Sequence, residues 1–215
     1  MSKITYDIQQ DNDAQSPREW DNLSTMVFWH RNYSIGDINP NRENDPESWL
    51  RSWLVENGHL TEEGAERMTF EKLWNKFNSV AVVVSVYAYE HGGITISSRA
   101  YSCTFDSGQL GFAFVSYAKL REEYSRRNIT HAFAEKIRGY IDGEIKTLDA
   151  YLTGDVWGYV VERDGEQVDS CWGIFDYDEA VKEAKASVAY FEKEEIVKAD
   201  VSQDAIAYAQ MEMII

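Results

Sequence analysis

Alternating hydrophobic and polar residues mark several half-buried β-strands in this chain. Residues 3–9 alternate in this way, and Val80 to Tyr89 form the strongest strand pattern, β-branched and apolar on both faces. A strand of that kind is typical of the middle of a sheet. His91-Gly92-Gly93 and Asp164-Gly165 are turn sequences that predict two hairpins. The predicted strands of the sheet lie at about 80–99, 110–117 and 156–175.

Apolar residues three and four positions apart predict helices over much of the remaining chain. Asp45-Pro46 supplies an N-cap and a first-turn proline for a helix through about Glu56. The spacing after Thr61 predicts one further helix through about Phe77, and residues 40–78 are interpreted as a helical insertion. Residues 196–215 fit either a short strand followed by a helix or one more amphipathic helix.

The order of these elements predicts an α+β fold. The helices follow hairpins instead of separating parallel strands, so an antiparallel sheet built from hairpins should pack against helices. A length of 215 residues fits a single domain spanning 1–215 with a core large enough to need no disulfide.

The charge of the chain is strongly negative and unevenly distributed. Lys and Arg number 21 against 37 Asp and Glu, a net charge of −16. Such a charge disfavours a basic nucleic-acid-binding surface or a polybasic membrane anchor. Residues 141–215 carry 18 acids and 6 bases, whereas residues 61–140 carry 9 acids and 10 bases. The excess therefore lies in the last third of the sequence.

These acids suggest a surface that occupies the nucleic-acid groove of another protein. Duplex DNA presents one charge per about 1.7 Å of its axis, and closely spaced carboxylates can produce a similar field. The alternative interpretation is the solvated face of ordinary helices. The predicted partner-binding residues are Asp142, Glu144, Asp149, Asp155, Glu162, Asp164, Glu166, Asp169, Asp176, Asp178 and Glu179.

Little in the sequence points to catalysis. The histidines lack metal-binding spacing, no nucleotide-binding motif is present, and Cys103 and Cys171 are interpreted as reduced, half-buried thiols. We predict no catalytic residue, no metal and no cofactor. The alternative is a small-ligand-binding protein or hydrolase centred on residues 16–37. Its polar group would be Asp21, His30, Arg31 and Asp37.

The segments Ser16 to Met26 (SPREWDNLSTM) and His30 to Asp37 (HRNYSIGD) resemble the N-terminal signature of a protein family of bacteriophages and integrated elements. Pieces at 106–111, 151–156 and 169–173 also resemble this family, so the resemblance extends over most of the chain. Most members of the family carry no assigned function. The resemblance therefore implies an origin in a mobile element and no particular activity.

Small acidic phage proteins often inhibit host restriction enzymes or CRISPR effectors by occupying their nucleic-acid sites. By this analogy of class we expect a non-enzymatic anti-defence protein in the host cytoplasm. Its partner would be a basic nucleic-acid-binding host protein, with no direct binding to nucleic acid or to a membrane. A structural phage component and a homodimer remain as alternatives, and the polar N-terminus predicts no signal peptide.

Overall fold

The computed structural model describes residues 2–41, 44–103 and 105–212, with the backbone alone for residues 198–212. Contacts within the chain group into two compact units. The middle unit comprises residues 16–153, and the terminal unit joins residues 1–15 to residues 154–215. The sequence predicts one domain, whereas the contacts divide the chain because its two ends pair in a sheet of their own.

The middle unit contains a four-stranded antiparallel sheet in the order β2-β5-β3-β4. The predicted central strand is confirmed, since β3 pairs with β5 on one side and with β4 on the other. Alternate residues of β3 enter two different cores: Val82 and Val86 face one side, and Ala81 and Val83 face the other. The strands are β2 (Thr25–Phe28), β3 (Ala81–Glu90), β4 (Ile94–Ser97) and β5 (Ser107–Ser116).

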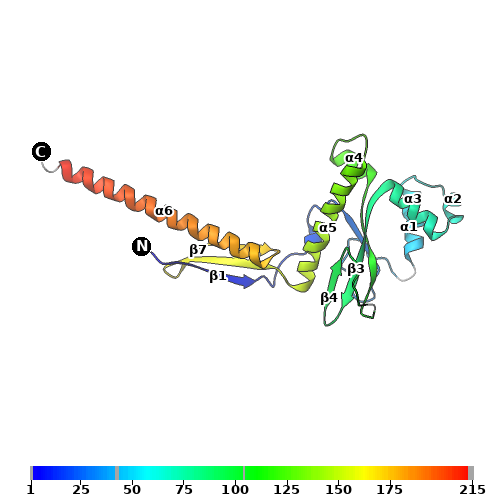
Figure 1. Ribbon diagram of the computed structural model, residues 1–215, viewed down its shortest axis with the longest axis horizontal. Helices are drawn as coiled ribbons and strands as arrows, with labels where there is room; N and C mark the ends of the chain where they lie inside the picture. Colours follow the sequence, from blue (N-terminus) through cyan, green and yellow to red (C-terminus); the bar gives the residue numbers. More distant parts are fainter. Residues whose placement is uncertain (1, 42–43, 104, 213–215) are drawn as a thin grey trace. The chain divides into compact units, whose positions relative to one another are not determined.

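Helices cover both faces of this sheet and give the middle unit three layers (Figure 1). The long helix α5 packs on one face through a stripe that includes Ile137, Ile141, Ile145 and Leu148. The helices between β2 and β3 pack on the other face. The helical elements are η1 (Pro17–Glu19), α1 (Pro46–Glu56), α2 (Glu62–Glu66), α3 (Phe70–Val80), α4 (Tyr117–Glu123) and α5 (His131–Thr153).

The single helix predicted from Thr61 to Phe77 is wrong, because the chain forms two helices there. Thr69 adopts the extended conformation of an N-cap residue, so it begins α3 as Thr61 begins α2. The guanidinium of Arg51 donates to the carbonyl oxygens of Ala65 (3.2 Å) and Met68 (3.4 Å). These contacts satisfy backbone acceptors at the break, which a continuous helix would have paired internally.

The terminal unit is a three-stranded antiparallel sheet in the order β1-β6-β7, with one long helix against it (Figure 1). Tyr159, Val161 and Ala184 form the buried centre of its small core. The turn predicted at Asp164-Gly165 is confirmed: both residues have positive φ, 53° and 88°, as a two-residue hairpin turn of this type requires. The elements are β1 (Ile4–Gln10), β6 (Trp157–Arg163), β7 (Glu166–Ile174) and α6 (Tyr177–Glu212).

The helix α6 decides between the two interpretations of the last segment. It continues without a break to Glu212, so a strand after residue 195 is wrong for the described residues, and residues 213–215 lie outside them. The fold class is confirmed: two antiparallel sheets pack against helices in an α+β arrangement. In the described ranges, no helix combines the length and apolar character needed to cross a membrane.

We predict that Gly111→Ala destabilises the middle unit. A Cβ at Gly111 would lie 2.0 Å from the Val27 carbonyl oxygen of the paired strand β2, so the backbone would have to move. The free energy of unfolding should fall by about 3 kcal/mol, measured by urea unfolding. Gly108→Ala on the same strand is the control, because nothing lies within 4 Å of its Cβ. Equal stability of the two variants would contradict the close approach of Gly111 to the Val27 carbonyl oxygen.

Candidate functional site

The segment singled out at residues 16–37 is organised by a buried arginine. The Arg18 side chain is only 8% exposed and lies against two carboxylates, Asp37 and Glu144. Its Nε and Nη2 donate to the two oxygens of Asp37 at 3.0 and 2.6 Å. Nη1 donates to Glu144 at 3.3 Å, and Nη2 also donates to the Ser24 carbonyl at 2.8 Å. This two-pronged geometry is the strong form of an arginine–carboxylate pair.

Glu144 joins this network from the helix α5. Its carboxylate accepts from the backbone N–H groups of Leu23 (2.8 Å) and Ser24 (3.2 Å) and from the Ser24 hydroxyl. Glu144 lies three residues after Ile141 and four before Leu148, within the phase of the apolar stripe of α5. That position is the signal in the sequence that predicts an inward-facing acid with a buried partner.

The Gly36-Asp37 pair at the end of the segment has a structural role. Asp37 accepts from the Met26 N–H at 2.7 Å in addition to its contacts with Arg18. A Cβ at Gly36 would lie 2.9 Å from the Met26 carbonyl oxygen, so the close approach favours glycine. Arg18 belongs to the SPREWDNLSTM segment, but its central role in this arrangement is not predicted from the sequence, because its partner Glu144 lies 126 residues away.

The four residues proposed as a secondary site do not converge. Asp37 is paired with Arg18, whereas the ring of His30 contacts Glu90 through Nε2 at 2.8 Å. The other ring nitrogen of His30 accepts from two backbone N–H groups, those of Asn32 and Tyr33. Both nitrogens of the histidine are therefore occupied by contacts within the fold.

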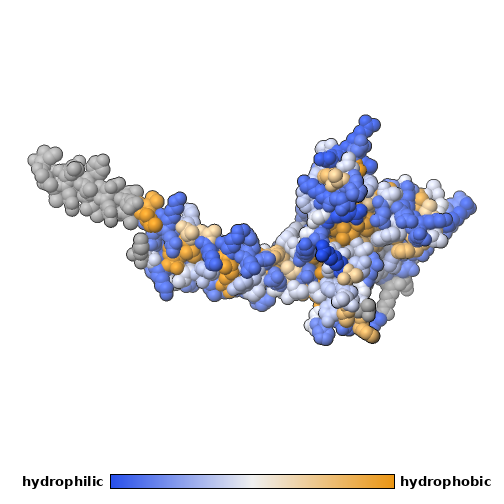
Figure 2. Space-filling view, viewed as in Figure 1, coloured by the Kyte–Doolittle hydropathy of each residue, from blue (hydrophilic) through white to orange (hydrophobic). Residues whose placement is uncertain are grey.

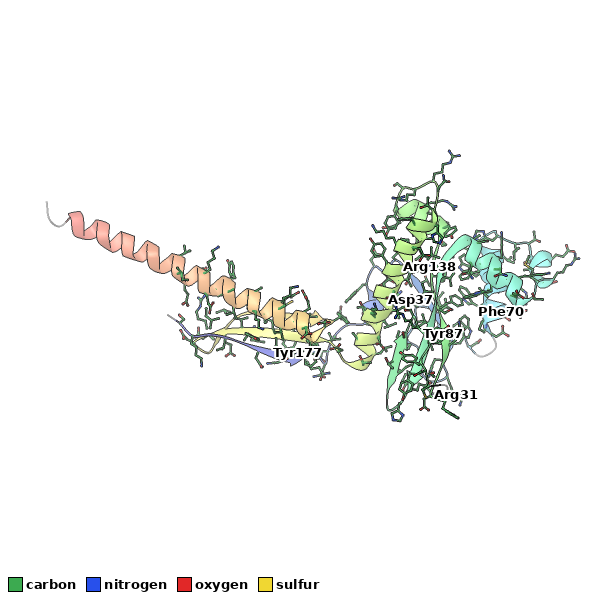
Figure 3. All side chains as sticks on the ribbon, in the orientation of Figure 1. Arg31, Asp37, Phe70, Tyr87, Arg138 and Tyr177 are labelled. Atoms are coloured by element: carbon green, nitrogen blue, oxygen red, sulfur yellow. The ribbon has the colours of Figure 1, made fainter. Side chains whose placement is uncertain are left out.

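The remaining two residues of that group, Asp21 and Arg31, are exposed. Figure 3 shows Arg31 and Asp37 well apart in the middle unit. The structure therefore shows a separation of the four residues predicted as a polar cluster at residues 16–37. Its physical reason is that Asp37 and His30 already satisfy neighbouring backbone and side-chain groups.

The acids of α5 that are predicted to bind a partner also accept hydrogen bonds within the middle unit. Asp149 accepts from the Thr95 hydroxyl (2.6 Å) and from the Ile96 N–H (2.7 Å) of β4. Asp142 accepts from the Ser98 hydroxyl and pairs with Lys146 at 2.8 Å. Asp142, Glu144 and Asp149 thus hold α5 to the sheet and to the loop before β2. Their partner-binding role stays a prediction, and the structure shows that all three make contacts within the middle unit.

The other predicted acids belong to the terminal unit, and most of them are exposed. Asp169 is the exception, because it is half-buried and accepts from the Ser187 hydroxyl of α6. Asp176 and Asp164 keep exposed charges while they accept from the backbone N–H groups of Glu179 (2.9 Å) and Lys3 (2.8 Å). The exposed members are Asp155, Glu162, Asp164, Glu166, Asp176, Asp178 and Glu179.

Six of the seven exposed acids form two groups within the terminal unit. Glu162, Asp164 and Glu166 surround the β6–β7 turn, and Asp176, Asp178 and Glu179 surround the start of α6. The nine residues of β7 separate the two groups by about 30 Å. Figure 2 shows hydrophilic residues spread along this unit with apolar ones between them. The acids are therefore distributed along the unit and do not form one block.

Other chemistry is sparse. Cys103 and Cys171 are free and half-buried, as predicted. In the part of the chain that the structure describes, no group of three or more His, Cys, Asp or Glu side chains is placed to hold a metal ion. Comparisons with protein-family models, curated proteins and solved structures find no match for the chain.

We predict that Arg18→Ala lowers the free energy of unfolding by about 3 kcal/mol, because it leaves Asp37 and Glu144 without their buried cation. Arg67→Ala is the control: Arg67 and its partner Glu63 are 76% and 75% exposed, so the loss should be within about 0.5 kcal/mol. Guanidinium unfolding followed by circular dichroism measures both. If Arg18→Ala lowers the free energy of unfolding no more than Arg67→Ala does, the ion pairs of Arg18 add nothing to stability.

A second prediction concerns pH. The hydrogen bonds from Lys146 and then Ser98 hold the pKa of Asp142 below its ordinary value of 3.8. The ionised carboxylate therefore stabilises the folded state above about pH 4, and this contribution is lost as the pH falls through the lowered pKa. The stability difference between the native chain and Asp142→Asn should shrink on acidification. Lys146→Met removes the largest cause of the lowered Asp142 pKa and should therefore itself reduce the pH dependence of the stability. A difference that stays constant down to acidic pH would refute the linkage.

Proposed function

We propose that this chain is a non-enzymatic, mobile-element-encoded inhibitor that binds a basic nucleic-acid-binding host protein through its terminal unit. The observation that carries the proposal is the division of charge between the units. The terminal unit contains 18 acids and 6 bases, a net charge of −12, and the middle unit contains 19 acids and 15 bases, a net charge of −4. The smaller unit therefore carries most of the negative charge.

The placement of the exposed carboxylates supports this proposal. The two acidic groups of the terminal unit are about 30 Å apart along β7, close to the length of one turn of duplex DNA at about 34 Å. A protein that grips DNA over one turn presents cations over a similar length. Carboxylates at both ends of the sheet could engage two such basic patches simultaneously.

Exposed aromatic side chains accompany these acids. Trp172 on β7 and Tyr177 at the start of α6 are 46% and 47% exposed, and Tyr190 on α6 is 65% exposed. Aromatic residues are enriched at the centres of protein interfaces, where they contribute apolar contact area. Charge attraction would steer the partner, and the aromatic contacts would then slow its dissociation.

The anti-defence role rests on class analogy with small acidic phage proteins and on the phage-like segments of the sequence. A restriction enzyme or a CRISPR effector has the required chemistry, because each binds duplex DNA in a basic channel. Inhibition of either enzyme by occupying this channel requires no catalytic group on the inhibitor. Exclusion of DNA from the channel is enough to stop the host enzyme.

The test is capture of bacterial lysate proteins on the immobilised full-length chain, followed by elution with rising salt and by competition with duplex DNA. We expect a nucleic-acid-binding protein that duplex DNA displaces, since screening and competition both act on charge. The variant Glu162→Gln, Glu166→Gln, Asp178→Asn, Glu179→Gln should weaken its binding by about tenfold or more.

A variant with the same change of net charge in the middle unit is the matched control. Glu62→Gln, Glu66→Gln, Glu71→Gln, Glu122→Gln removes four exposed acids there and should alter binding by no more than about twofold. Equal weakening by both variants would reduce the effect to net charge alone and overturn the proposed surface. Captured proteins that duplex DNA fails to displace would overturn the DNA-like mode of binding.

A further inference from the structure

A pocket lined by aromatic rings opens in the middle unit, away from the ionic network at Arg18. Its volume is about 340 Å³, at the small end of the range for ligand sites. It lies between the sheet and the two longer helices that cover that face. The lining residues are Trp29, Pro46, Phe70, Trp74, Ser85, Gln109, Leu110, Gly111 and Phe112.

The pocket exists because the helices cover only part of the sheet face. Ala81 and Val83 of β3 enter the core beneath α1 and α3, but Ser85, next on the same face, lines the pocket. Ser85 is the one polar residue in the run from Ala81 to Val86. Within the described part of the chain its hydroxyl has no hydrogen-bond partner, so a polar group faces the empty space.

Aromatic rings form the walls and floor. Phe112 contacts Trp29 on one side and Trp74 on the other, with ring centroids 5.6 and 5.5 Å apart. Phe70 extends the second wall by stacking on Trp74 at 6.2 Å, yet it remains 44% exposed (Figure 3). These spacings are those of packed aromatic clusters, and the pocket is an open space bordered by their members.

The lining also excludes one class of ligand. None of the lining residues carries a charge, so an ion entering the pocket would lose its hydration without gaining a counter-charge. An uncharged ring loses little hydration and gains contacts with four aromatic side chains. The Ser85 hydroxyl and the Gln109 amide can hydrogen-bond a polar edge of that ring.

We propose that this pocket binds one uncharged aromatic ring with a hydrogen-bonding edge, of the phenol or indole class. The ring can belong to a free small molecule or to the side chain of a polypeptide. The site is independent of the acidic surface of the terminal unit, since every lining residue belongs to the middle unit.

The test is titration of the full-length chain with p-cresol, which is the tyrosine side chain as a free molecule. The indole N–H resonances of Trp29 and Trp74 should shift in a saturable way, with a Kd of about 1 mM or tighter. Ser85→Leu should abolish the shifts by filling the pocket, and Phe70→Ala should weaken binding. Tyr140→Ala is the control, because Tyr140 is an exposed aromatic on α5 outside the lining set, and it should leave the affinity unchanged.

Toluene tests the polar edge separately from the ring. Ser85→Ala should lower the affinity for p-cresol by about threefold to tenfold and leave that for toluene unchanged, since only p-cresol can use the hydroxyl. An acetylated Gly-Tyr-Gly peptide distinguishes the source: binding tighter than p-cresol supports a polypeptide ligand, and binding of p-cresol alone supports a free molecule. Unsaturable shifts with both p-cresol and toluene, or preferential binding of tetramethylammonium, would overturn the proposal. The unchanged amide spectrum of each variant verifies its fold.

Discussion

The guanidinium of Arg18 contacts three parts of the middle unit at once. It pairs with Asp37 at the end of the loop after β2 and with Glu144 on α5, and it donates to the carbonyl of Ser24. Burying one charge alone would be costly, so each ion here requires the others. The carboxylates also accept from the backbone N–H groups of Leu23, Ser24 and Met26, which are thereby satisfied in an irregular segment. These polar contacts act together with the apolar stripe that packs α5 on the sheet.

The same chemistry separates two kinds of carboxylate in this acidic chain. Glu144 and Asp149 accept hydrogen bonds within the middle unit, whereas Glu166 and Asp178 of the terminal unit are exposed. A carboxylate that accepts several hydrogen bonds from its own fold stabilises that fold and contributes little to a contact surface. The formal charge of −16 therefore overstates the charge available to a partner. The proposed binding surface lies where exposed carboxylates are numerous.

The aromatic pocket of the middle unit depends on apolar contact and not on charge. The rings that line the pocket have no neighbouring atoms on the side that faces it, so they lack van der Waals contacts there. Trp49, Leu50 and Phe77, which are buried in the core beneath α1 and α3, do not line the pocket. The proposed binding surface, which depends on charge, and the proposed binding pocket, which depends on apolar contact, thus lie in separate units of one chain.

Local chemistry in the sequence determined the caps, turns and strand patterns. Asp45 before a proline, Asp164-Gly165 and the apolar run through β3 each specify their element by rules that act over a few residues. Only the tertiary structure decided that β1 pairs with β6, that Arg51 stabilises the break between α2 and α3, and that Glu144 pairs with Arg18. These outcomes depend on partners far away in the sequence, and the helical phase that turns an acid inward does not identify its partner.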